Sequence, residues 1–220
     1  MSEVVEHAVG TDKAPVMALK PDADLVGRSP LAHVALAELA QHNPAEAGVH
    51  FGELPLQAHF TLRCAADNPA QQSAVESVVG VPLPVEPLRA VTAGDAIIRW
   101  MSPDEWLISV PEARAFALEE GFRTHMPGHY ALVNVSGGLT VYRLSGPHAI
   151  DVLKRSVPVD LHHSQFPVGK VVSTVFAKAG ATLRRVDDQT FELVVRRSFA
   201  DYIWLWIQDA SREFGLSIDV

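Results

Sequence analysis

Short segments with alternating apolar and polar residues recur along this chain, and stretches with helical spacing separate them. Residues 57–63 alternate with period two, which predicts a strand. Residues 95–100 and 105–110 are also strand-like, and the Ser, Pro and Asp between them predict a hairpin turn. A helix is predicted over residues 70–79, because Asn68 can cap its N-terminus. This region therefore mixes strands and helices.

The same order of elements continues through the second half of the chain. A helix is predicted over residues 111–120, ended by Gly121. Residues 130–135 and 140–144 then predict a pair of strands, and Ser145 is expected to cap a following helix. Three further strands are predicted at 171–176, 181–186 and 190–195.

The last predicted helix carries an apolar stripe and a second group of aromatic residues. Ser198 is expected to cap it, and Gly215 to end it. The stripe consists of Phe199, Ile203, Trp206, Ile207, Ala210 and Phe214. Trp204 and Tyr202 fall partly outside this stripe. They indicate either an unusually wide core face or a contact patch for a partner, because aromatic residues are enriched in interface cores.

Strand pairs followed by helices predict an α+β fold, with antiparallel sheets and helices packed on one face. The pattern occurs twice, at about 56–125 and about 129–215, which predicts two ferredoxin-like lobes in a body that spans residues 51–220. The two halves share this order of elements and no evident sequence similarity.

Residues 1–50 differ from the body, because they contain no alternating apolar segment. Their one periodic stretch predicts a short helix over about 30–41, with Ser29 as N-cap and a narrow stripe that includes Leu31 and Val34. A short helix on an extended N-terminal arm cannot form a core of its own. We therefore expect the arm to dock on the body or on a partner, with Leu31 and Val34 as candidate contacts.

Composition narrows the class of protein. The 220 residues include 26 acidic and 18 basic side chains, for a formal charge of −8, and 48% are hydrophobic. This apolar fraction argues against a disordered chain, and the acidic balance argues against a nucleic-acid-binding surface. No apolar run is long enough for a membrane span, and the acidic N-terminus is unlike a signal peptide. We expect a cytoplasmic globular protein.

The usual nucleotide and nucleophile motifs are absent from the sequence. There is no G-x-G-x-x-G fingerprint, and the Gly-Lys at 169–170 lacks the rest of a P-loop. Ser136 and Ser145 lie in glycine-containing turns, but neither has the flanking glycines of a nucleophile elbow.

The histidines and the single cysteine also give no clear site. His162 and His163 are adjacent, so their side chains are expected to diverge in a strand. Pro127 and Gly128 interrupt the spacing between the next candidate pair, His125 and His129. Cys64 is interpreted as a small buried residue. The sequence therefore predicts no catalytic, cofactor-binding or metal-binding residue.

Five segments carry a resemblance to a known family, and they occur in the family's order: 28–33, 101–108, 142–147, 158–162 and 197–204. Together they resemble the gamma subunit of heterotetrameric sarcosine oxidase. That family is similar in fold to the glycine-cleavage T-protein, a folate-binding aminomethyltransferase, which would account for the two lobes.

The resemblance implies partners and cofactors. It implies alpha, beta and delta subunits in a complex that oxidises sarcosine with oxygen and tetrahydrofolate to glycine, hydrogen peroxide and 5,10-methylenetetrahydrofolate. FAD, FMN, NAD, tetrahydrofolate and zinc would be held by the other subunits, and none by this chain.

One departure from the T-protein pattern bears on activity. The resemblance places an acidic residue in the T-protein where residues 179–186 of this chain carry no carboxylate, and Arg184 and Arg185 are present instead. Loss of activity with retention of the fold is the leading hypothesis. The alternatives are a stand-alone folate-binding protein or aminomethyltransferase, and an adaptor for another oxidoreductase. Arg184 and Arg185 could pair with the glutamate tail of folate, or lie on a solvent-exposed strand face.

Overall fold

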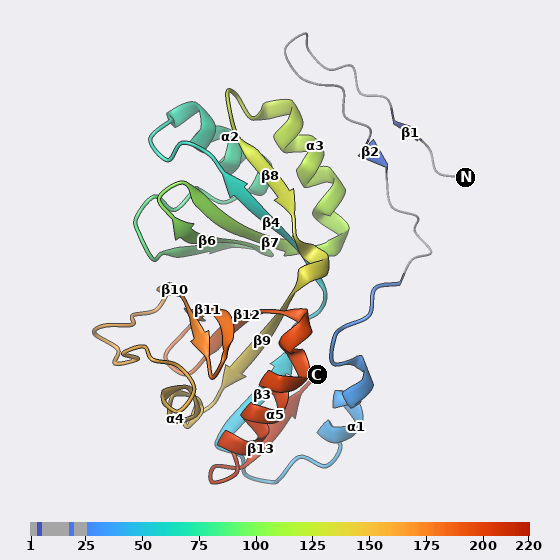
Figure 1. Ribbon diagram of the computed structural model, residues 1–220, viewed down its shortest axis with the longest axis vertical. Coiled ribbons are helices and arrows are strands. Elements are labelled where there is room, and N and C mark those ends of the chain that lie inside the picture. The colour runs from blue at the N-terminus through green and yellow to red at the C-terminus, as the bar shows by residue number, and fades with distance from the viewer. Residues whose placement is uncertain (1–3, 6–17, 20–25) are drawn as a thin grey trace.

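The computed structural model describes residues 4–5, 18–19 and 26–220. Its body contains two sheets, which lie one above the other in Figure 1. The first lobe consists of one sheet and two helices. Its strands follow the order β5-β6-β7-β4-β8, and all neighbours are antiparallel. They span β4 Gln57–Arg63, β5 Ala90–Ala93, β6 Ala96–Ser102, β7 Glu105–Pro111 and β8 Ala131–Asn134. The helices are α2 Pro69–Val79 and α3 Ala115–His125.

The second lobe contains the larger sheet, in the order β10-β11-β12-β9-β3-β13. Its neighbours are antiparallel except β13 and β3, which run parallel. The strands span β3 Val49–Glu53, β9 Leu139–Ser145, β10 Val171–Phe176, β11 Ala179–Arg185, β12 Phe191–Arg196 and β13 Leu216–Asp219. The helices are α4 Ala149–Lys154 and α5 Ala200–Ala210.

Each sheet buries one face under its helices, because successive side chains of a strand point to opposite faces. In β4, Ala58, Phe60 and Leu62 join the core under α2 and α3. The other faces of the two sheets meet, and Leu107 of β7 packs with Val141 of β9 and Val194 of β12. The layers therefore run helices, sheet, sheet, helices, and the predicted α+β fold with two lobes is confirmed (Figure 1).

The predicted helix at 70–79 is confirmed together with its cap. The Asn68 side chain accepts hydrogen bonds from the backbone N–H groups of Ala70 and Gln71. The predicted end of the next helix at Gly121 is wrong, because α3 continues to His125. A Cβ at Gly121 would lie 2.7 Å from Val78 Cγ1, so this glycine allows α2 and α3 to approach closely.

Two predicted serine caps are wrong. Ser145 is the last residue of β9, and α4 begins after His148 without a side-chain cap. Ser198 lies inside a 3₁₀ turn, Arg197–Phe199, which precedes α5. Helix α5 ends at Ala210 and not at Gly215. Gly215 has φ +73°, a left-handed conformation that favours glycine, and it leads into β13.

In the two lobes, three strands were missed by the sequence pattern: β3, β5 and β13. Strand β3 spans the predicted boundary at residue 50 and pairs with β9 and β13. The pattern failed here because apolar and polar residues alternate only over Val49, His50 and Phe51 before Gly52, a run too short to indicate a strand.

The predicted helix at 30–41 is divided into two short pieces. A 3₁₀ helix, Ala32–Val34, is followed by α1, Leu36–Ala40, and Ala35 between them has φ +54°. Leu31 is buried in the core of the second lobe. Of the predicted arm, residues 1–3, 6–17 and 20–25 lie outside the described residues, and the short strands β1 Val4–Val5 and β2 Ala18–Leu19 between them pair with each other. Within the described residues, no helix is long and apolar enough to span a membrane.

Candidate functional site

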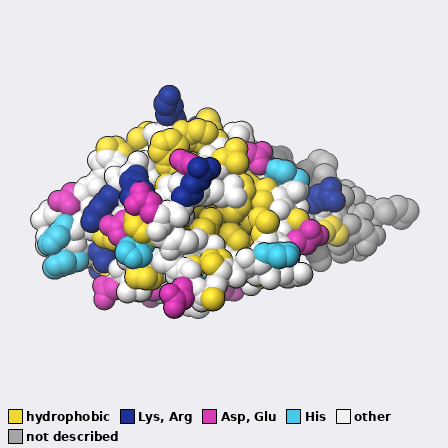
Figure 2. Space-filling view, turned by 90° about the horizontal axis from the view of Figure 1, so that it is seen from below, with side chains coloured by type: hydrophobic (Ala, Val, Ile, Leu, Met, Phe, Trp, Pro, Cys, Tyr) yellow, Lys and Arg dark blue, Asp and Glu magenta, His cyan; other side chains and the backbone are white. Residues whose placement is uncertain are grey.

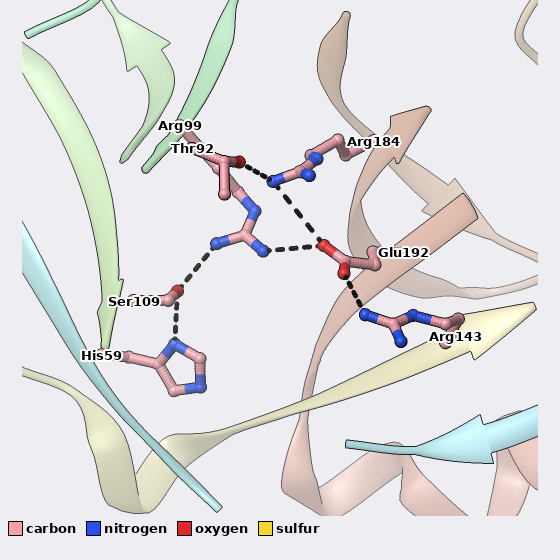
Figure 3. A network of polar contacts seen from close by, with 7 residues as sticks. All are labelled: His59, Thr92, Arg99, Ser109, Arg143, Arg184 and Glu192. Atoms are coloured by element: carbon pink, nitrogen blue, oxygen red, sulfur yellow. Dashed lines mark hydrogen bonds and ion pairs between the residues drawn. The ribbon is translucent and has the colours of Figure 1, made fainter. Parts of the chain in front are cut away.

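Polar side chains converge in the space between the two sheets. Strand alternation directs His59, Arg99 and Ser109 of the first lobe away from the helices, toward the second lobe. Strands β9, β11 and β12 direct Arg143, Arg184 and Glu192 toward the first lobe. Figure 3 shows these residues together with Thr92 of β5.

Glu192 is the centre of this network. Its Oε2 lies 3.3 Å from Arg99 Nη2 and 3.8 Å from Arg184 Nη1, and its Oε1 accepts a hydrogen bond from Arg143 Nη2 at 3.1 Å (Figure 3). Arg184 also donates to Thr92 Oγ1 at 3.0 Å. Because Arg99 and Thr92 belong to the first lobe and the other residues to the second, the network joins the lobes.

Burial and the neighbouring opposite charges shift the pKa values of Arg99 and Glu192 in opposite directions. Arg99 is completely buried, which lowers its pKa to about 10 despite the neighbouring Glu192 carboxylate. Burial by itself raises the pKa of Glu192, but Arg99, Arg184 and Arg143 outweigh it and hold the pKa below its ordinary value. Glu192 is therefore ionised at neutral pH, and Arg99 is protonated.

His59 lies at the inner end of the network. Arg99 Nη1 donates to Ser109 Oγ at 2.7 Å, and Ser109 Oγ lies 2.9 Å from His59 Nδ1. Since the guanidinium can only donate, the serine hydroxyl accepts from Arg99 and donates its own O–H to His59 Nδ1. Burial, and then the charge of Arg99, lower the pKa of His59 to about 4. The imidazole is neutral at neutral pH.

The interpretation of Arg184 and Arg185 as an exposed strand face is wrong, because both side chains are buried. Arg185 donates to the carbonyl oxygens of Phe166, Asp187 and Asp188 and lies over the Phe191 ring. Arg184 is bound to Thr92 and Glu192. These contacts occupy the donors that the folate alternative would use for a carboxylate tail.

Cys64 is buried, as predicted. Burial, and then the nearby Asp104 carboxylate, raise the pKa of its thiol to about 11, so the thiolate nucleophile is scarce at neutral pH.

The histidine pair differs from expectation. The rings of His162 and His163 lie 4.2 Å apart, so the prediction that they diverge is wrong; they occupy a turn and not a strand. In the part of the chain that the structure describes, no three His, Cys, Asp or Glu side chains are grouped as metal ligands would be.

Two of the predicted partner contacts lie in the chain's own core. Trp204 is 4% exposed and packs on Phe51 with ring centroids 5.0 Å apart, so of its two alternatives the wide core face is confirmed and the exposed contact patch is wrong. Leu31 is 1% exposed. Val34 and Tyr202 are partly exposed beside this core and stay candidate contacts.

The outer face of α5 carries an exposed apolar residue, which lies outside the predicted apolar stripe. Leu205 is 62% exposed, and the helix turns this residue away from the sheet. Figure 2 shows hydrophobic side chains gathered on one face of the second lobe, with charged residues of both signs among them.

A cleft of about 730 Å³ opens at the other end of the space between the sheets. Its apolar walls come from both lobes: Met101, Leu107, Val135, Leu139 and Val194. Arg196 and Arg197 also line it, near the end of β12. The sequence pattern assigned these residues to separate strands and turns and gave no sign that they meet.

The fold itself occurs in a larger enzyme. The glycine cleavage system aminomethyltransferase T from Bartonella henselae matches with a TM-score of 0.55 at 12% identity, over 83% of this chain and 50% of that one. At this identity the similarity concerns the fold alone, and it agrees with the predicted T-protein-like architecture.

Closer similarity is found among sarcosine oxidase subunits. A chain of the heterotetrameric sarcosine oxidase from Corynebacterium sp. U-96, in complex with pyrrole 2-carboxylate, matches with a TM-score of 0.74 at 29% identity, over 86% of this chain and 96% of that one. The sarcosine oxidase subunit gamma of Corynebacterium sp. (strain U-96) is 30% identical over 88% of this chain and 94% of its own length. The subunit gamma from Arthrobacter sp is 32% identical, over 86% and 91%. The model of the Sarcosine oxidase, gamma subunit family matches residues 63–213. By these matches, the chain belongs to the sarcosine oxidase gamma subunit family.

Proposed function

We propose that this chain is the gamma subunit of a heterotetrameric sarcosine oxidase and that its role there is structural. Its relatives are named as this subunit, and the similarity covers nearly their whole length. The alpha, beta and delta subunits would be its partners in the cytoplasm. They would hold FAD, FMN, NAD, tetrahydrofolate and zinc and carry out the oxygen-dependent conversion of sarcosine and tetrahydrofolate to glycine, hydrogen peroxide and methylenetetrahydrofolate.

The proposal of a structural role rests on the protonation states of the buried titratable groups. Glu192 is held ionised by three arginines, which would prevent it from accepting a proton near neutral pH. His59, with a pKa of about 4, and Cys64, with a pKa of about 11, are also far from the range that acid–base or thiolate chemistry requires at pH 7. Each group is instead bound to or buried among residues of this chain.

The proposal is tested with the four subunits produced together and with this chain produced alone. We expect the purified complex to consume oxygen with sarcosine and the isolated chain to show neither this activity nor bound flavin. The variants His59→Gln and Cys64→Ala, assembled into the complex, should keep the turnover number of the unaltered enzyme within about twofold.

Two results would contradict the proposal. One is sarcosine oxidation by the isolated chain. The other is a turnover number lowered by more than about tenfold in a fully assembled His59→Gln or Cys64→Ala complex with all its flavin present. A chain that does not co-purify with the other subunits would refute its assignment as a subunit.

A further inference from the structure

The cleft between the sheets lies beyond the buried network, at the end of the molecule where β12 ends and β6 turns into β7. On β6 and β12, a residue of the cleft lies two positions from a residue of the network, so both face the same space. Met101 follows Arg99, and Val194 follows Glu192. Leu107, Val141 and Val194 pack together between the network and the cleft. The network therefore closes the inner end, and the outer end is open.

Apolar surface continues from the walls of the cleft onto its rim. Val175 is 43% exposed on β10, the edge strand of the second sheet, two residues from Ser173 in the lining. Phe199 is 40% exposed and directly follows the lining residue Ser198. The apolar area is thus larger than the cleft itself. Exposed apolar patches with polar margins are typical of surfaces that contact another protein.

The cleft also contains a cation that no described residue neutralises. Among the described residues, no hydrogen-bond or ion-pair partner is found for the Arg196 side chain, which lies on the same strand face as Val194. Arg197 beside it donates only to the Gly137 carbonyl, at 3.4 Å. The acidic residue of the lining, Glu105, lies 3.7 Å from Arg63 Nε and so has a cation of its own.

These features favour a ligand of a particular chemistry. Arg196 and Arg197 favour a carboxylate, because guanidinium groups pair with carboxylates in a planar, two-bond geometry. The apolar walls and rim favour hydrocarbon side chains on either side of that carboxylate. Hydroxyl groups complete the lining and can bond to a peptide backbone: Thr61, Ser173, Thr174, Thr182 and Ser198.

We propose that the cleft binds an extended segment of a partner subunit that carries an Asp or Glu between apolar side chains. This inference rests on the proposed function as a subunit. A protein segment fits better than a small anion, because the apolar surface extends past the cleft to Val175 and Phe199. The carboxylate pairs with Arg196, and the neighbouring apolar side chains cover Leu139 and the exposed rim residues Val175 and Phe199.

The experiment uses co-expression of the four subunits, with affinity purification through a tag on another subunit. Arg196→Glu and Val175→Asp alter the cleft. Arg212→Glu and Val168→Asp are matched controls, because Arg212 has an 80% exposed side chain and Val168 is 48% exposed, both outside the cleft lining. We expect the cleft variants to lower recovery of this chain in the complex by at least about tenfold and the controls by less than about twofold.

All four changes lie on the surface, so the isolated variants should keep the circular dichroism spectrum and melting temperature of the unaltered chain. Cleft variants that fold and are recovered like the unaltered chain would overturn the inference and leave the proposed function intact. Equal losses in cleft and control variants would also overturn it. A small anion found by native mass spectrometry on the unaltered chain and lost in Arg196→Glu, with recovery unchanged, would assign the cleft to a small molecule. Failure of the unaltered chain itself to co-purify would instead refute the proposed function.

Discussion

At the scale of single residues, the decisive feature is one carboxylate shared by three arginines. Glu192 is 2% exposed and Arg99 is fully buried, so neither charge can be compensated by water. Removing one partner from a buried ion pair is strongly destabilising, because the other charge stays buried without compensation. Glu192 therefore stabilises the folded state because, without it, the buried Arg99 guanidinium would have no counter-ion.

We predict that Glu192→Gln lowers the free energy of unfolding by about 3 kcal/mol at pH 7, because Arg99 loses its counter-ion. Since the folded-state pKa of Glu192 is lowered, its contribution is present above the unfolded-state value of about 4.3 and is lost as pH falls through the folded-state pKa. Urea unfolding measured from pH 7 to pH 3 should show that the difference in free energy of unfolding between the unaltered chain and Glu192→Gln becomes smaller in acid. Glu76→Gln, at an exposed position of α2, is the control and should change little. A deficit that is constant with pH would contradict this account.

We also predict that His59 titrates near pH 4 in the folded chain, because burial and Arg99 disfavour its charged form. The unfolded state takes up this proton near pH 6.5. The stabilisation that comes from the lowered pKa of His59 is therefore fully present above pH 6.5, and up to about 3 kcal/mol of it is lost as the pH falls toward 4. NMR of the imidazole gives the pKa directly, and His59→Gln should lack both the resonance and this part of the pH dependence. A folded-state pKa above about 6 would show that the ring is solvated.

At the scale of elements, the exposed edge of the second sheet is closed by a side chain. Strand β13 is an edge strand, and Asn43 donates to the Ile218 carbonyl at 2.9 Å and accepts from the Ile218 N–H at 2.8 Å. The amide imitates a neighbouring strand at this position. Unpaired strand edges promote association with other chains, so Asn43 also protects the edge.

We predict that Asn43→Ala lowers the free energy of unfolding by about 1–2 kcal/mol, because both backbone groups of Ile218 lose their partner. Association of the isolated chain should also increase, which size-exclusion chromatography over a concentration series can measure. Asn43→Asp keeps the acceptor and loses the donor, so we expect a loss of stability there as well. Gln41→Ala, at an exposed position nearby, is the control. Equal behaviour of Asn43→Ala and this control would refute the role of the amide.

At the scale of the whole molecule, the two lobes have separate cores but shared polar contacts. The first core lies under α2 and α3, and the second under α4 and α5. Between the sheets, Arg99 reaches Glu192 and Arg184 reaches Thr92. The backbone adds a further connection, because Val171 N–H donates to the Leu88 carbonyl at 2.8 Å and Ala90 N–H donates to the Gly169 carbonyl at 2.9 Å.

We predict that the lobes unfold together. Native-state hydrogen exchange should give the slowest amides of β7 and β12 the same opening free energy. In Glu192→Ala the opening free energies of β7 and β12 should differ by more than about 1 kcal/mol, because the carboxylate that joins the lobes is gone. Glu76→Ala serves as the control, and in this variant the opening free energies of β7 and β12 should stay equal. Different opening free energies in the unaltered chain would show that the lobes are independent.

Features that depend on residues nearby in the sequence were predicted, and features that depend on distant residues were not. The strand at 57–63 and the Asn68 cap were predicted because they depend on neighbours within a few residues. The position of Trp204 was left open between a wide core face and a contact patch, because Phe51, on which it packs, lies in a strand that the pattern missed. Similarly, Arg184 and Arg185 lie in a predicted strand, but alternation alone does not reveal whether each face is covered.

By itself, the sequence determined the α+β order, the two lobes, the side-chain alternation within the predicted strands and, through its resemblance, the family. The tertiary structure decided which polar residues meet. Arg99 and Glu192 are 93 positions apart, and only the stacking of the two sheets brings them into contact. The cleft beside them was likewise decided by the tertiary structure. Its lining comes from strands of both lobes, and local periodicity specifies the face of a strand but not what lies opposite.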